Sequence, residues 1–149
     1  MSGALRFLIL MALAIWIGAI AFFSFVAAPV LFQVLGPTRA GEVVTVLLPR
    51  YYVLGAGAAT VTMLGAAVLG RRWRATAVAA GLGLAVTVWA GWVVTPQAHG
   101  ARTRLQAAGQ DPGTDPEFRR LHAVAMTLNA VALAAGLGAL AMASAASRR

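Results

Sequence analysis

Residues 7–38 read FLILMALAIWIGAIAFFSFVAAPVLFQVLGPT, a stretch without a charged side chain. About 20 apolar helical residues, rising about 1.5 Å each, cross the hydrocarbon core of a bilayer, which is about 30 Å thick. Three further uncharged stretches, at residues 51–70, 75–97 and 123–147, are long enough to do the same. The sequence therefore predicts an integral membrane protein.

Turn signals and charges separate these stretches. Gly36-Pro37 is typical of a turn, and Pro96 can end a helix because proline lacks the backbone N–H and its ring clashes with the preceding turn. The first apolar run is longer than the core of a signal peptide, which has about 7–15 residues, so we expect an anchored helix there. We predict an all-α fold, an integral membrane four-helix bundle forming one transmembrane domain over residues 1–149, with helices at about 5–35, 43–70, 75–95 and 117–146.

Composition agrees with a membrane protein and excludes several classes of site. Hydrophobic residues make up 60% of the chain and charged residues only 11%. The absence of cysteine excludes disulfides, thiolate metal sites and a covalently attached haem. The net charge of +8 comes from arginines scattered at the ends of the apolar stretches, which favours contact with lipid headgroups over nucleic acid. We expect the lipid bilayer as a partner, and either a second copy of the chain or another membrane protein.

Small residues recur at helical spacing and predict close packing between helices, because lipid supplies little drive for apolar helices to meet. The expected helix over 75–95 has such a stripe, and the expected helices over 43–70 and 117–146 have comparable faces. The stripes contain Ala79, Gly83, Thr87, Gly91 and Thr95; Tyr51, Gly55, Ala58, Thr62 and Gly65; and Ala125, Ala132, Gly136 and Ala139.

The polar segment between the last two helices contains the sequence DPGTDPE at residues 111–117. It could be an acidic cation site, but the pattern favours a turn followed by a helix cap. Asp115 suits the N-cap, Pro116 the first helical position and Glu117 the positive end of the helix dipole.

The candidate functional positions are polar residues in or beside apolar helices. Asn129 lies within an apolar run, where it predicts either an interhelical hydrogen bond or the lining of a ligand or ion path. His122 either bonds to residues 95–104 or joins His99 as a haem or metal ligand. Arg50 and Tyr51 are expected to anchor a helix at the membrane boundary.

Positively charged residues divide evenly between the two sides of the expected topology. The compact cluster of Arg71, Arg72 and Arg74 lies on the side that carries no acidic residue. We therefore expect a multi-pass protein of the cell membrane, the inner membrane of a bacterium, with both termini in the cytoplasm.

Five motifs lie in order along the chain: Trp16-Ile17-Gly18, Pro29-Val30-Leu31-Phe32, Leu48-Pro49-Arg50-Tyr51-Tyr52, Thr95-Pro96 followed by Arg102 or Arg104, and Phe118-Arg119-Arg120-Leu121-His122 with Asn129. Together they resemble the transmembrane-protein-205-like family, whose bacterial members are described as domain of unknown function 4149. The resemblance covers nearly the whole chain and implies a four-helix membrane protein in which these residues have no established catalytic role. The eukaryotic relative is associated with resistance to a platinum drug, which hints at transport or trafficking, and has a longer loop between its third and fourth helices. The family-like positions are Trp16, Gly18, Pro29, Phe32, Pro49, Tyr51, Pro96, His122 and Asn129.

The sequence contains no nucleophile–base constellation, phosphate loop or paired carboxylates, so we do not expect an enzyme, and we expect no cofactor. We predict a non-enzymatic packed helical bundle that supports a membrane process or binds a partner. One alternative is a small-solute or metal-ion transport or resistance protein. A second is a membrane haem or copper protein that uses His99 and His122.

Overall fold

A computed structural model describes residues 2–148, and none of these residues lies in a strand. The all-α class is therefore as expected. The main helices are α1 (Ser2–Phe22), α2 (Ala28–Val68), α3 (Arg74–Trp89), α4 (Thr95–Ala107) and α5 (Pro116–Ser147). Short elements connect them: π-helical turns η1 (Phe23–Ala27) and η3 (Ala90–Val94), and 3₁₀ turns η2 (Arg71–Trp73) and η4 (Pro112–Thr114).

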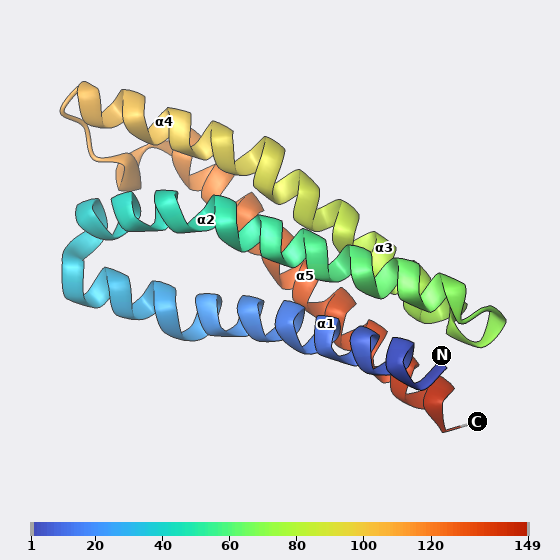
Figure 1. Cartoon of the computed structure of the whole chain (residues 1–149). Helices are drawn as coiled ribbons and strands as arrows, with labels where there is room; N and C mark the ends of the chain where they lie inside the picture. Colours follow the sequence, from blue (N-terminus) through green and yellow to red (C-terminus); the bar gives the residue numbers. More distant parts are fainter. Residues whose placement is uncertain (1, 149) are drawn as a thin grey trace.

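Within residues 2–148, three helices are long and apolar enough to cross a membrane: Gly3–Val68, Arg71–Ala107 and Pro116–Ser147. The expected count of four is therefore not confirmed. The first of the three is not straight, because Gly36 has φ 70° and ψ 166°, a left-handed conformation that favours glycine. Figure 1 shows the chain turning back on itself at this point.

The expected end of a helix at residue 95 is wrong, because the helix continues through Pro96 to Ala107. The π-helical turn η3 ends two residues before Pro96, and η1 ends two residues before Pro29. A proline ring in a regular helix clashes with the carbonyl four residues earlier. The wider π-helical turn accommodates the ring, so each proline bends a helix without ending it.

The core is built around the fully buried indole of Trp16 on α1. Three glycines of other helices face this ring. A Cβ at Gly83 would lie 2.2 Å from Trp16 Cη2, one at Gly136 3.6 Å from Cε3, and one at Gly55 3.7 Å from Cδ1. Glycine thus leaves room for the indole of Trp16. Most residues of the predicted stripes are buried, among them Ala58, Thr62, Thr87, Ala132 and Ala139.

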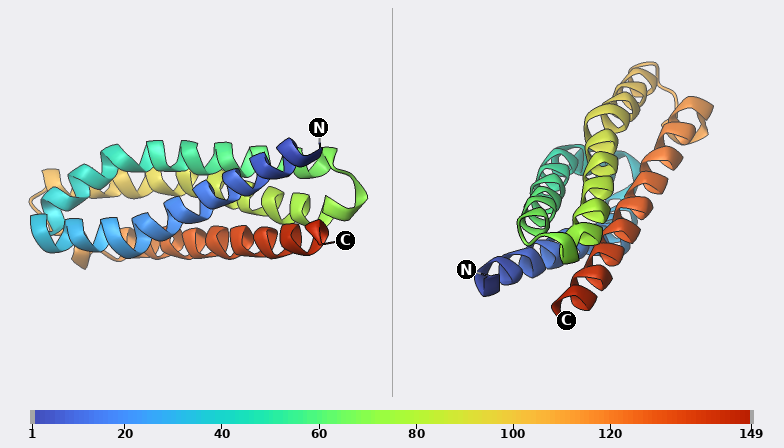
Figure 2. Two further views of the ribbon diagram at one scale, coloured as in Figure 1. Left: turned by 60° about the horizontal axis from the view of Figure 1, so that its bottom comes forward. Right: turned by 90° about the vertical axis from the view of Figure 1, so that its right-hand side faces the viewer.

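Both ends of the chain lie at one end of the bundle (Figures 1 and 2). The turn at Gly36 and the connection from α4 to α5 lie at the opposite end. At this opposite end α4 and α5 form the two walls of a cavity.

Candidate functional site

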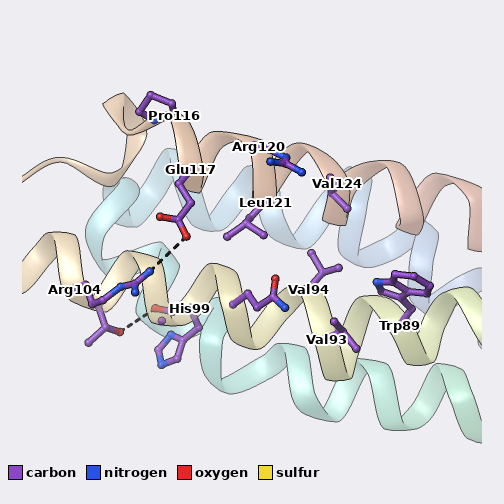
Figure 3. A pocket seen from close by; sticks show the side chains of 13 residues that line it. Trp89, Val93, Val94, His99, Arg104, Pro116, Glu117, Arg120, Leu121 and Val124 are labelled. Carbon is purple, nitrogen blue, oxygen red and sulfur yellow. Dashed lines mark hydrogen bonds and ion pairs between the residues drawn. The ribbon is translucent and has the colours of Figure 1, made fainter.

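The cavity between α4 and α5 has a volume of about 1190 Å³. One wall is formed by η3 and α4 with the end of α3, and the other by the first turns of α5. Figure 3 shows the two walls facing each other. The lining residues are Trp89, Val93, Val94, Gln97, His99, Gly100, Thr103, Arg104, Pro116, Glu117, Arg120, Leu121 and Val124.

Both walls change from apolar to charged in the same direction. Along the first wall, Trp89 and Val93 are followed by polar residues and then by Arg104. Because α5 runs the other way, its wall starts with charged Glu117 and ends with Val124. The cavity therefore has a charged mouth at the end of the bundle and an apolar interior.

A helix cap positions the α5 wall. The Asp115 carboxylate accepts a hydrogen bond from the Phe118 backbone N–H at 2.8 Å, with Pro116 at the first helical position. Asp111 likewise accepts from the Gly113 N–H at 2.9 Å, which holds the preceding turn. The turn and cap predicted from the sequence are confirmed, and they place Glu117 at the mouth of the cavity and the residues after it along the wall.

At the mouth of the cavity, one arginine is paired with a carboxylate and, among the described residues, a second arginine is not. Arg104 Nη2 and Glu117 Oε1 form an ion pair at 3.5 Å across the mouth, drawn as a dashed line in Figure 3. Both side chains are largely exposed, so this pair is weak. Arg120 also lines the cavity, and within residues 2–148 its side chain has no hydrogen bond or ion pair. The mouth carries two arginines and one glutamate, an excess of positive charge.

A separate polar cluster lies inside the apolar part of the bundle. The Tyr51 hydroxyl of α2 donates a hydrogen bond to Oδ1 of Asn129 on α5. The Asn129 amide donates to Ser24 Oγ of η1 at 2.8 Å. Asn129 therefore bonds to two neighbouring helical segments at once, which is the first of the two arrangements expected for it, an interhelical hydrogen bond.

The two π-helical turns both pack on the neighbouring tyrosines of α2. Phe23 in η1 lies 5.0 Å from the Tyr51 ring, centroid to centroid. Gly91 in η3 lies against Tyr52, since a Cβ there would be 2.7 Å from Tyr52 Cγ. The π-helical turns thus bring the ring of Phe23 against Tyr51 and the backbone of Gly91 against Tyr52. Such turns are frequent at functional sites.

The other predicted positions are spread over the bundle. His99 lines the cavity, whereas His122 does not; its ring stacks on Phe118 with a centroid distance of 6.1 Å. Arg50 Nη1 donates to the Val46 carbonyl of its own helix at 2.8 Å. No group of three or more His, Asp, Glu or Cys within residues 2–148 is placed to hold a metal ion.

Two features were not anticipated from the sequence. Ser24 is the only hydroxyl-bearing side chain in residues 7–32, a signal that could have pointed to it. Arg102 Nη2 donates to the Pro37 and Thr38 carbonyls at 3.1 and 2.8 Å, and fastens α4 to the chain just after the turn. Its guanidinium lies over Gly41, where a Cβ would be 1.3 Å from Nη1.

Comparison with known proteins gives one match. A family model described as a domain of unknown function (DUF4149) matches residues 11–107. The match ends at the last residue of α4, so one wall of the cavity lies within it and the α5 wall lies beyond it. No curated protein and no solved structure was found to match.

Proposed function

The chain belongs to the DUF4149 family, and we propose that it is a non-enzymatic membrane protein that binds an amphiphilic molecule from the bilayer in the cavity between α4 and α5. The observation that carries this proposal is the shared gradient of the two walls, from Trp89 and Val124 inside to Arg104 and Glu117 at the mouth. A molecule with an apolar body and a charged head has the same gradient. Because its chain moves from one apolar environment to another, its affinity depends on packing against the two walls and on the contacts of its charged head.

The contents of the cavity support binding rather than catalysis. Its one hydroxyl-bearing lining residue is Thr103, whose Oγ1 donates to the His99 carbonyl at 3.0 Å. The carboxylate at the mouth, on Glu117, is paired with Arg104. Within residues 2–148 the Thr103 hydroxyl is therefore not hydrogen-bonded to a base that would activate it as a nucleophile.

The topology that we propose has four crossings. The Gly3–Val68 helix crosses twice because it folds back at Gly36, and Arg71–Ala107 and Pro116–Ser147 cross once each. The four crossings form a four-helix bundle in the inner membrane of a bacterium, with both termini in the cytoplasm. The mouth of the cavity then lies at the outer surface of that membrane.

We also propose the relationship to transmembrane-protein-205-like proteins. Its support is the set of motif residues Phe118, Leu121, His122 and Asn129 on α5. These residues lie beyond the matched range.

The test is the amount of phospholipid that stays on the protein after repeated exchange into mild detergent, measured as phosphorus per chain. We expect about one lipid per chain, and we expect Val124→Trp to lose it because the indole projects into the apolar part of the cavity and obstructs the path of the acyl chain. The matched control is Val131→Trp, an exposed position two turns further along α5 and outside the cavity. Equal retention by both variants would contradict the proposal, and Val124→Phe gives a smaller second probe if the Trp variant does not fold.

A further inference from the structure

The length of the cavity indicates how much of a ligand it takes. From residue 89 to residue 104 the helical wall rises about 22 Å, at about 1.5 Å per residue. This exceeds half of the hydrocarbon thickness of about 30 Å, so the wall is long enough to accommodate the acyl chain of one leaflet together with its headgroup. Its volume of about 1190 Å³ lies above the 300–1,000 Å³ that is usual for small-molecule sites, by about a fifth. A small polar solute would leave most of this space empty.

The charged mouth indicates the head of the ligand. Arg104 is paired with Glu117, while Arg120, one turn after Glu117 on α5, has no partner within residues 2–148. A guanidinium presents several N–H donors in a plane and suits the oxygens of a phosphate. The unpaired charge therefore lies where a lipid phosphate would be when its acyl chain occupies the apolar interior.

We propose that the ligand is an anionic phospholipid, whose phosphate is bound by Arg120 at the mouth and whose acyl chain lies between α4 and α5 against Val93 and Val124. This inference rests on the proposed function, since it names the class of amphiphile that the same cavity takes. The pairing of Arg104 with Glu117 leaves a single positive charge at the mouth, which matches a lipid with one net negative charge.

Glu117 limits the affinity for such a lipid. Its carboxylate holds Arg104 at 3.5 Å and repels a phosphate placed beside it. Removal of the carboxylate charge frees the second guanidinium for the phosphate. Glu117→Gln is therefore expected to bind the anionic lipid more tightly than the unchanged protein, although it removes the ion pair at the mouth.

The experiment measures lipid choice by native mass spectrometry. Purified protein in mild detergent is mixed with equal amounts of palmitoyl-oleoyl phosphatidylglycerol and phosphatidylcholine, and the bound lipid is identified by its mass. We expect one phosphatidylglycerol per chain, bound about fivefold in preference to phosphatidylcholine, from one favourable arginine at the surface. Arg120→Gln is expected to remove most of this preference, and Glu117→Gln to increase it. The matched control is Arg119→Gln, which changes an exposed arginine outside the cavity and should leave the preference unchanged.

Several results would overturn the proposal. Equal binding of the two lipids, or equal effects of Arg120→Gln and Arg119→Gln, would contradict the assignment of an anionic headgroup. The proposed binding of an amphiphile would not be affected by this result. Displacement of the lipid by excess inorganic phosphate would assign a simple anion site. A dimer without bound lipid would assign the cavity to a second copy of the chain. Protein that retains neither lipid would contradict the proposed function itself.

Discussion

The indole of Trp16 occupies the space that a side chain at Gly83 would need, because a Cβ on Gly83 would lie 2.2 Å from Trp16 Cη2. The ring is fully buried and cannot swing into the lipid. Gly83→Ala is therefore expected to lower the free energy of unfolding by about 1–3 kcal/mol, the usual cost of overpacking a core. Unfolding in mixed detergent micelles, followed by circular dichroism, measures this change.

The matched control for that substitution is Gly57→Ala. Gly57 lies on α2, and a Cβ there would meet nothing within 4 Å. We expect Gly57→Ala to leave the stability unchanged or slightly raised, since alanine favours the helix by up to about 1 kcal/mol. Equal effects of the two substitutions would mean that Trp16 and Gly83 do not define the core.

The Tyr51–Asn129–Ser24 cluster provides a second prediction. Asn129→Ala removes both interhelical hydrogen bonds and leaves two hydroxyls without their partner in apolar surroundings. Hydrogen bonds between membrane helices contribute about 0.6 kcal/mol on average and up to about 1.7, so we expect a loss of about 1–2 kcal/mol. Thermal unfolding in detergent measures the loss.

Thr127→Ala is the control for Asn129→Ala. Thr127 is exposed on the same helix, and in the part of the chain that the structure describes its hydroxyl bonds only to the Ala123 carbonyl of that helix. Similar stability of the two variants would show that the cluster does not join the helices. An Asn129→Ala variant that keeps its stability but loses a solute flux would favour the transport hypothesis instead.

Arg102 and Gly41 should behave as one unit. Gly41→Ala places a methyl group where the Arg102 guanidinium lies, so the side chain must leave and lose its hydrogen bonds to Pro37 and Thr38. Arg102→Met removes the same bonds directly. Each substitution should cost about 1 kcal/mol of stability, and the double variant should cost no more than one of them.

A loss of stability in the double variant that is smaller than the sum of the two single losses shows that positions 41 and 102 interact. Arg50→Met is the matched control, because among the described residues Arg50 bonds only to a carbonyl of its own helix. Fully additive losses at positions 41 and 102 would contradict the contact that the structure places between them.

The membrane class and the small-residue faces could be predicted because they depend on composition and helical spacing. The cap at Asp115 could also be predicted from the sequence, since the Asp-Pro-Glu pattern acts through local backbone geometry. The continuation of the helix beyond Pro96 could not be predicted, because no local pattern in the sequence indicates the π-helical turn η3 that ends two residues before this proline. Trp73 is buried although it lies between exposed arginines in the sequence, since its environment depends on helices distant in sequence. The cavity mouth likewise requires the approach of α4 to α5, which no local pattern specifies.

The topology can be tested with single cysteines, because the natural chain contains none. The exposed positions Arg39 and Gln110 should react with a membrane-impermeant maleimide in spheroplasts, and Arg74 and Ser147 only after permeabilisation. Labelling of positions 39 and 74 from the same side would contradict two crossings by the Gly3–Val68 helix. The reverse pattern at all four positions would keep the crossings and invert the orientation.

The most direct test of the central claim, that the cavity between α4 and α5 binds a lipid, is photo-crosslinking in a bilayer. The protein is reconstituted with phosphatidylglycerol that carries a diazirine on its acyl chain, irradiated, and mapped by peptide mass spectrometry. We predict that adducts concentrate on residues 89–94 and 121–124, well above the level on exposed apolar faces such as Phe7 and Leu8 of α1. Adducts spread evenly over all the exposed apolar faces would contradict the claim.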